Sequence, residues 1–204
     1  MKILLIYLFI IAPVVGFSQI GVKGGLNFSN VTNASSINAG SRSGYHVGLF
    51  LAGPTKSILS SRTEFLYSRQ GYNFSTNTAS GNVDLSYLMF PQFLAINITK
   101  YVQLQVGAQV SYLINATVDS TTSTGHASAD KIIGLYNRFD YGLGGGVEVH
   151  PLDMLVAGIR MNISFGKLYK EPEPGEAYSF IPDVDISNNL FQLYAGIKFG
   201  GKKE

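Results

Sequence analysis

Apolar and polar residues alternate along most of the chain after residue 19. The clearest case is Val102–Tyr112, where every second residue is apolar and the residues between them are Gln, Gly and Ser. A period of two residues is typical of a β-strand with two different faces. The pattern predicts eight strands, at about 20–29, 44–52, 59–72, 83–98, 102–112, 138–149, 155–165 and 191–199.

The segment at 83–98 departs from the simple pattern. Its apolar residues are odd-numbered from Val83 onward and even-numbered from Leu94 onward, and a strict pleat cannot place both sets on one face. Pro91 lies between the two sets and cannot donate a ladder hydrogen bond, so one interpretation is a β-bulge near residues 90 to 93. The other interpretation is an unbroken strand whose early apolar residues face inward, and the pattern alone favours neither.

The connections between the predicted strands are long and short in turn. Short links occur at 53–56, 99–101 and 150–153, and long ones, rich in Ser, Thr, Asn and acidic residues, at 30–43, 73–82, 116–137 and 167–188. Short periplasmic turns and longer extracellular loops are typical of outer-membrane barrels. The sequence therefore predicts an all-β, eight-stranded antiparallel up-and-down transmembrane β-barrel, with the first strand beginning on the periplasmic side.

Composition decides which face of the strands points outward. Charged residues make up 14% of the chain, well below the roughly 25% of a soluble domain, and the polar faces carry mainly Gln, Gly, Asn and Ser. A soluble barrel with an apolar interior would carry Lys and Glu outside, so we expect the apolar faces to contact lipid. An aromatic girdle at the strand ends would be formed by Tyr45, Tyr67, Tyr101, Tyr112 and Tyr136.

The first eighteen residues predict a cleaved export signal. Lys2 gives a positive start, an apolar run follows to Val15, and Gly16 and Ser18 provide small residues for cleavage. Pro13 and the short apolar span disfavour a retained membrane anchor. The expected organisation is a signal peptide over 1–18 and an outer-membrane barrel domain over 19–204, located in the outer membrane.

Little in the sequence indicates catalysis, a cofactor or a metal. The chain has no cysteine and a net charge of +2, which exclude thiol chemistry and disulfides and give no electrostatic case for nucleic acid. The three histidines lie on separate segments; we expect a hydrogen bond for His46 inside the barrel and a role in the turn or an interface for His150. His126 lies among loop serines and aspartates, but such residues occur in any solvated loop. Acidic residues cluster in the last long loop, at Glu171, Glu173, Glu176, Asp183 and Asp185. Solvation of the loop also accounts for this cluster, and cation or partner binding is the alternative.

The predicted inward face carries charges of both signs. Eight strands enclose an interior that side chains can fill, so we expect these charges to form a network and block conduction. The first and last strands must be neighbours, which should bring Lys23 and Lys198 together, with Glu64 and Glu148 as the compensating carboxylates. The predicted lumen charge network consists of Lys23, Arg62, Glu64, Glu148, Arg160 and Lys198.

Four short motifs resemble the PorT-type outer-membrane β-barrel family: GVKGGLN at 21–27, EFLYSRQG at 64–71, YLMFP at 87–91 and YGLGGGVE at 141–148. Two departures are Met89, where similar proteins often carry a carboxylate, and a C-terminus that extends beyond Phe199 to Glu204. The resemblance implies an integral outer-membrane protein without shared enzymatic activity. Named members include a component of a protein-secretion system.

These observations give a leading function and several alternatives. The barrel would present four long loops for structural, adhesive or partner-assembly roles, surrounded by outer-membrane lipid and lipopolysaccharide and inserted by the barrel-assembly machinery. Surface or secretion-system proteins are the candidate partners. The alternatives are a small pore or transporter, an accessory part of a secretion system, and a loop-based enzyme.

Overall fold

The computed structural model describes residues 19–31, 39–55, 57–75, 79–122, 125–126, 130–131, 133–170 and 186–199. The predicted signal peptide, the loop serines near His126 and the acidic residues of the last long loop lie outside the side chains that it describes. In the described part of the chain, no helical segment has the length and apolar character that a bilayer crossing requires.

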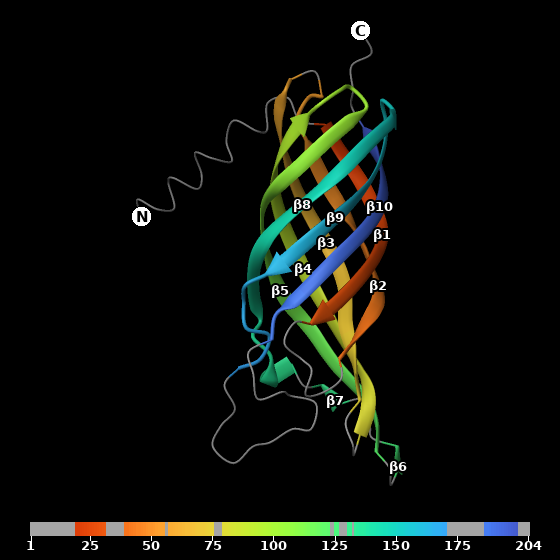
Figure 1. Ribbon diagram of the computed structural model, residues 1–204, viewed down its shortest axis with the longest axis vertical. Coiled ribbons are helices and arrows are strands. Elements are labelled where there is room, and N and C mark those ends of the chain that lie inside the picture. Colours follow the sequence, from red (N-terminus) through yellow and green to blue (C-terminus); the bar gives the residue numbers. More distant parts are fainter. Residues whose placement is uncertain are drawn as a thin grey trace, which may run out of the picture.

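Eight long strands of the described chain form one closed antiparallel barrel, which confirms the predicted fold (Figure 1). Each strand pairs with the next in sequence, and β1 pairs with β10 to close the ring. The long strands are β1 (Gln19–Val31), β2 (Gly40–Ala52), β3 (Leu59–Ser75), β4 (Ala79–Asn97), β5 (Val102–Thr122), β8 (Phe139–Leu152), β9 (Leu155–Ser164) and β10 (Asn188–Phe199). Two-residue strands β6 (Gly125–His126) and β7 (Asp130–Lys131) pair with β5, and a 3₁₀ turn, η3 (Ile133–Leu135), follows them.

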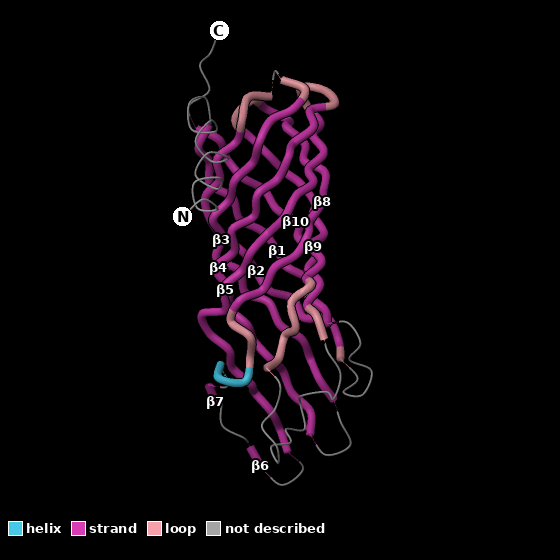
Figure 2. Tube along the Cα trace, turned by 90° about the vertical axis from the view of Figure 1, so that its left-hand side faces the viewer, coloured by secondary structure: helices cyan, strands magenta, loops and turns pink. Residues whose placement is uncertain are grey.

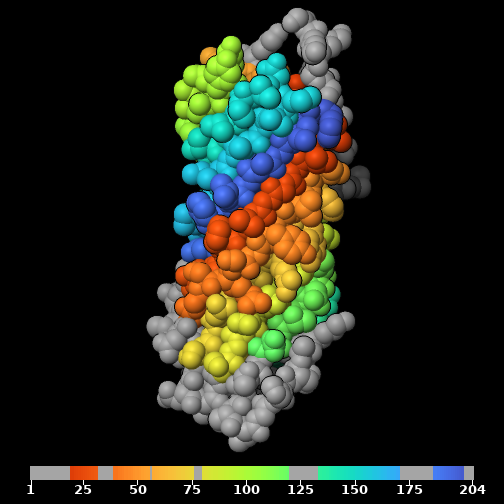
Figure 3. All heavy atoms as spheres, turned by 90° about the vertical axis from the view of Figure 1, so that its right-hand side faces the viewer, coloured from red at the N-terminus to blue at the C-terminus, as the bar shows by residue number. Residues whose placement is uncertain are grey.

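The outward faces of the strands form an apolar belt around the barrel. Its residues, including Val22, Leu193 and Met161, are about half exposed although they are large and apolar. Figure 3 shows the part of this surface where the first and last strands, β1 in red and β10 in blue, run side by side. We define the belt as the outward-facing residues within 20–28 of β1, 45–51 of β2, 59–67 of β3, 88–96 of β4, 104–114 of β5, 139–149 of β8, 155–163 of β9 and 191–199 of β10.

Four of the five predicted girdle tyrosines lie on the outside, and one does not. Tyr45, Tyr101 and Tyr112 are exposed, and Tyr67 is half-buried against Tyr45. Tyr136 is fully buried, so its assignment to the girdle is wrong. It lies between η3 and β8 and packs in a buried cluster with residues of β3, β4 and β10.

The barrel wall is longer on one side than the sequence predicts. The strands predicted at 59–72, 83–98 and 102–112 extend further in the structure, where β3, β4 and β5 have 17, 19 and 21 residues. Much of the predicted loops at 73–82 and 116–137 is therefore strand. We call the end with these extensions the long-loop end and the opposite end the short-turn end; Figure 2 shows both, with β6 and β7 at the long-loop end.

The fourth strand is unbroken, and the interpretation with a bulge near Pro91 is wrong. Odd-numbered residues of β4 face inward from Val83 to Ala95, and Pro91 keeps regular register with Gln109 of β5. The irregularity lies on β5 instead, where Ile114 is the extra residue between the partners of Ser86 and Tyr87. A bulge reverses the inward and outward sides of the strand beyond it.

Candidate functional site: the barrel lumen

The six predicted lumen charges all point into the barrel and are almost completely buried. They come from five strands, because the pleat of each strand directs every second side chain inward. Five of them are at most 2% exposed, and Lys198 is 6% exposed. Charges this deeply buried must be paired, since water does not solvate them.

Glu64 is the centre of the charge cluster. Its carboxylate is 2.7 Å from Lys23 Nζ, 3.1 Å from Arg62 Nε and 2.7 Å from Arg160 Nη1. Arg160 donates through both terminal nitrogens, so it binds the carboxylate with two hydrogen bonds. Three cations therefore share one carboxylate.

The pair between Arg160 and Glu64 crosses the whole lumen. Around the ring of eight long strands, β9 and β3 are four strands apart in either direction among the described strands. Strands four apart in an eight-stranded ring face each other across the interior, yet the Nη1 and Oε2 atoms are 2.7 Å apart. The side chains from opposite walls meet, and the lumen is filled at this level.

Arg62 connects the cluster to the second carboxylate. It donates through Nη1 and Nη2 to the two oxygens of Glu148, at 3.0 and 2.8 Å. Tyr194 donates its hydroxyl proton to the same carboxylate, at 3.0 Å. The guanidinium group of Arg62 also lies 3.7 Å above the ring of Phe50, and that of Arg160 lies 4.0 Å above Phe93. Aromatic faces thus stabilise the two buried guanidinium groups.

Lys198 is connected differently from the sequence expectation. Lys23 and Lys198 lie on neighbouring strands, but Lys23 contacts Glu64 whereas Lys198 Nζ is 3.0 Å from His150 Nδ1. The other ring nitrogen of His150 is 3.2 Å from Glu148. His150, which we expected to act in a turn or an interface, is a buried link between Lys198 and the carboxylate.

A group of hydrogen-bonded amide side chains lies next to the charges inside the lumen, on the side toward the long-loop end. Asn27 is its centre: its amide donates to Ser68 Oγ at 2.9 Å, and its Oδ1 lies 2.8 Å from His46 Nδ1. Gln192 donates to the same oxygen at 3.1 Å and accepts from Asn162 at 3.0 Å. His46 therefore has the hydrogen bond inside the barrel that the sequence analysis expects.

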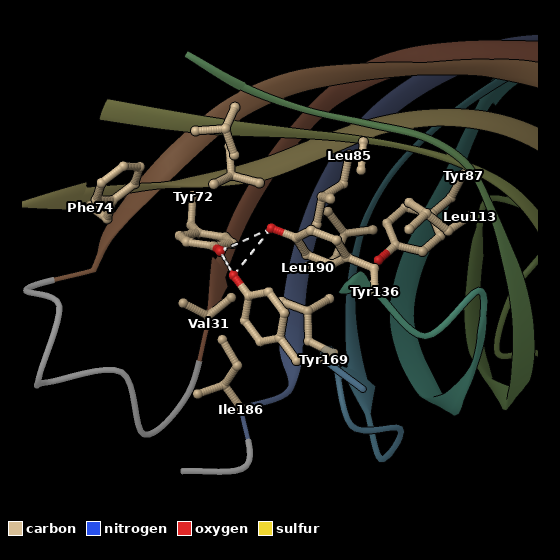
Figure 4. Close-up of a cluster of buried hydrophobic side chains, with 14 of the residues drawn as sticks. Val31, Tyr72, Phe74, Leu85, Tyr87, Leu113, Tyr136, Tyr169, Ile186 and Leu190 are labelled. Atoms are coloured by element: carbon tan, nitrogen blue, oxygen red, sulfur yellow. Dashed lines mark hydrogen bonds between the residues drawn. The ribbon is translucent and has the colours of Figure 1, made fainter. Parts of the chain in front are cut away.

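An apolar cap fills the lumen beyond the amides (Figure 4). Tyr72, Tyr136 and Tyr169 point their hydroxyl groups at one another and are joined by hydrogen bonds. Apolar side chains of β4 and β10, such as Leu85 and Leu190, pack around them and are at most 2% exposed. Burial raises the pKa of Tyr72 and Tyr136 above the ordinary tyrosine value, so both stay neutral.

The sequence analysis did not identify this cap. The sequence feature that could have revealed the cap is the set of odd-numbered apolar residues at the start of the predicted strand at 83–98. The bulge interpretation would have turned these residues outward. Figure 4 shows Leu85 and Tyr87 directed into the same cluster as Tyr136. Together the charges, the amides and the cap occupy successive levels of the described interior, from the short-turn side toward the long-loop end.

An ion cluster on the outer wall stands beyond the apolar belt, at the long-loop end. Asp84 accepts from Arg42 Nε at 2.6 Å and from Arg69 Nη2 at 2.9 Å. Partial burial alone would raise the pKa of Asp84, but the hydrogen bonds from the two arginines outweigh it and lower that pKa below its ordinary value. Gly71 makes room for this contact, because a Cβ atom there would lie 3.0 Å from Arg42 Cδ.

The described side chains form no metal-binding group. Within the described ranges, no group of three His, Asp or Glu residues is placed to hold a metal ion. The carboxylates of the lumen are each bound to cations of the protein itself, which leaves them unsuited to act as bases. The candidate site is therefore an interior in which the described charged groups are paired with one another.

Solved structures with this fold support the assignment. The crystal structure of Ail, the attachment invasion locus protein of Yersinia pestis, is similar at 16% identity and a TM-score of 0.50, covering 90% of this chain and 99% of that one. Ail in complex with the heparin analogue sucrose octasulfate gives 17% identity, a TM-score of 0.51 and the same coverage. Neisserial surface protein A gives 15% identity and a TM-score of 0.52, covering 88% of this chain and 97% of that one.

The sequence comparisons give the family itself. No curated protein sequence matches the chain significantly. Residues 13–170 match the family described as outer membrane protein beta-barrel domain, which is more than half of the chain. The matched region includes β1 to β9 and with them five of the six predicted lumen charges. The fold of the chain and this match agree. The chain belongs to the outer membrane protein beta-barrel domain family, and it is an outer-membrane protein.

Proposed function

We propose that this protein is a non-conducting barrel that anchors its long-loop end at the cell surface, where the loops contact other molecules. The observation that carries the proposal is the ion pair between Arg160 and Glu64, which joins opposite walls at 2.7 Å. A lumen crossed by a buried, bidentate ion pair and capped by packed tyrosines leaves no continuous water path through the described interior. An eight-stranded barrel then serves as a membrane anchor.

Planar-bilayer recording of the purified protein tests this function. We expect no stable single-channel currents, because ions cannot displace the side chains of the lumen without breaking several buried pairs. Heat-modifiable migration in detergent gels should accompany the recording, to show that the inserted protein is folded. Large, stable currents from folded protein would instead support the alternative function, a small pore or transporter.

The orientation of the barrel is part of the proposal. Outer-membrane barrels have short turns on the periplasmic side and longer loops on the extracellular side. On this pattern, the long-loop end lies outside the cell and the start of β1 lies in the periplasm. A protease site inserted near Ser123 or Pro174 should be cut on intact cells, while one at Pro54 or Asp153 should be cut only after the outer membrane is opened. Cleavage of the second pair on intact cells would reverse the orientation.

We further infer that the chain belongs to the PorT-type branch of these barrels, on the four motifs given above. This branch assignment makes an accessory role in protein secretion one form of partner assembly. Affinity purification from outer-membrane fractions tests it: co-purification with secretion components supports the accessory role, and a clean barrel supports a stand-alone surface protein. No enzymatic activity is proposed, because the described carboxylates and histidines of the lumen are bound within the protein.

A further inference from the structure

The apolar belt is interrupted at one place. Three polar side chains, Ser61, Thr63 and Gln92, point outward within the belt, and all three lie on the neighbouring strands β3 and β4. On the other six long strands, the outward-facing residues described within the belt are apolar residues, Gly or Tyr. A polar group that faces hydrocarbon is costly, so its confinement to one wall requires an explanation.

Gln92 lies near the middle of the membrane. It is five residues from Asn97, the end of β4 at the short turn. With a rise of about 3.3 Å per residue and a strand tilt of about 40°, five residues correspond to about 13 Å along the membrane normal. The apolar band of such barrels is about 25 Å tall. The exposed side chain of Gln92 is therefore at the depth where water is scarcest.

The hydrogen bonds of Gln92 are only partly satisfied. Thr63 Oγ1 lies 2.6 Å from Gln92 Oε1 and donates to it, which uses one of the two lone pairs of the amide oxygen and leaves the other open. The Nε2 group has two N–H donors, and the described residues provide no acceptor for them. Lipid tails provide none either, and an unpaired amide in an apolar medium costs free energy.

The surroundings of Gln92 would allow a close protein contact. Ala108 is its direct neighbour on β5 and has a small side chain. On the side toward the long loops, Phe65 and Phe90 form an exposed aromatic pair, with ring centroids 5.0 Å apart. Small residues beside polar ones are typical of interfaces within the membrane.

We propose that a second copy of this chain covers the wall around Gln92, forming a two-fold dimer in the membrane. All copies of a membrane protein share one orientation, so a two-fold axis runs along the membrane normal and each residue has the same depth in both copies. A residue at the axis thus meets its own counterpart. A glutamine amide carries both donors and an acceptor, so Gln92 of one copy donates Nε2–H to Oε1 of the other, and the reverse.

Thiol cross-linking in native outer membranes tests the dimer, because the chain has no cysteine of its own. Ala108→Cys places a single thiol beside Gln92 without removing the amide. Ala195→Cys is the matched control, an alanine on the lipid-facing side of β10, which lies four strands from β4 in the ring. A short bismaleimide should link two copies through residue 108 and give no product through residue 195.

Gln92→Leu in the Ala108→Cys background tests the role of the amide. Leucine is favourable in lipid, so this variant should fold and keep its heat-modifiable migration while the cross-linked dimer disappears. In detergent, sedimentation of Gln92→Leu in the otherwise unchanged chain should give a dimer dissociation constant about tenfold higher, as expected for two lost membrane hydrogen bonds. Equal cross-linking at both positions or none at residue 108 would overturn the proposal, as would an adduct with a different protein at residue 108.

Discussion

Removal of the Glu64 carboxylate is the most direct test of the lumen. Lys23 and Arg160 have no other carboxylate within ion-pair distance among the described residues, while Arg62 keeps Glu148. Glu64→Ala therefore leaves two buried cations without an anionic partner. Breaking a buried pair by removing one partner costs about 3–5 kcal/mol.

This energy predicts a measurable change in melting temperature. For a chain of this size, each kcal/mol corresponds to about 2–4 °C, so Glu64→Ala should lower the Tm by about 6–20 °C. Thermal melts of detergent-folded protein, followed by circular dichroism or by the gel-mobility shift, measure it. Glu64→Gln should fall between the wild type and Glu64→Ala, because the amide oxygen still accepts one hydrogen bond.

The control for this experiment is Asp153→Ala, which removes a carboxylate from an exposed turn and should change the Tm very little. Removing a cation together with the carboxylate should recover part of the loss, so Lys23→Ala combined with Glu64→Ala should be more stable than additivity predicts. A Glu64→Ala protein that melts within about 2 °C of the wild type would refute the reasoning, since it would show that water enters and screens the cluster.

Three further predictions concern the cap, the outer ion cluster and the wall. Leu85→Ala, in the fully buried cap, should destabilise the barrel by about 2–5 kcal/mol, measured by the same melts, and an unchanged Tm would argue against a packed cap. The lowered pKa of Asp84 means that its contribution is complete above about pH 4 and is lost as the pH falls below that. Asp84→Asn should therefore lower the Tm at neutral pH more than at low pH, and a pH-independent difference would contradict the ion-pair assignment. Gly107→Ala should impair folding, because its Cβ would lie 2.1 Å from a backbone oxygen of β4, whereas Gly145→Ala, at 3.5 Å from its nearest atom, should fold normally in a refolding assay.

The strand pattern and the identity of the inward charges follow from the sequence because a two-residue period places each side chain on a known face. The partner of each charge does not follow, since it depends on the stagger between strands. Glu148 and Arg160 lie on adjacent strands, β8 and β9, which alone would suggest that they pair. In the structure Arg160 reaches across the barrel to Glu64, and Arg62 takes Glu148 instead.

The long-loop end was less predictable for a different reason. Sequence reasoning assumed that apolar residues face lipid, which holds within the belt but reverses in the extensions beyond it. Val83 and Leu85 face inward because a protein core lies there, and Tyr136 is buried in that core although it resembles a girdle residue. The bulge at Ile114 is visible in the sequence only as a change in the alternation on β5, where the inward-facing residues are odd-numbered before it and even-numbered after it.

The seam between β1 and β10 also governs how the chain can be assembled. These are the first and last strands in sequence, and they pair over twelve positions from Ile20 to Val31. Every other pair of neighbouring long strands can form as a hairpin or after a short excursion, but the seam must wait until the last residues of the chain are made. Until then both outer strands present unpaired backbone groups, which invite pairing with other chains. An assisted insertion step that shields these edges would therefore matter most just before β10 closes the ring, and a chain shortened before Asn188 would leave one edge of β1 without a partner.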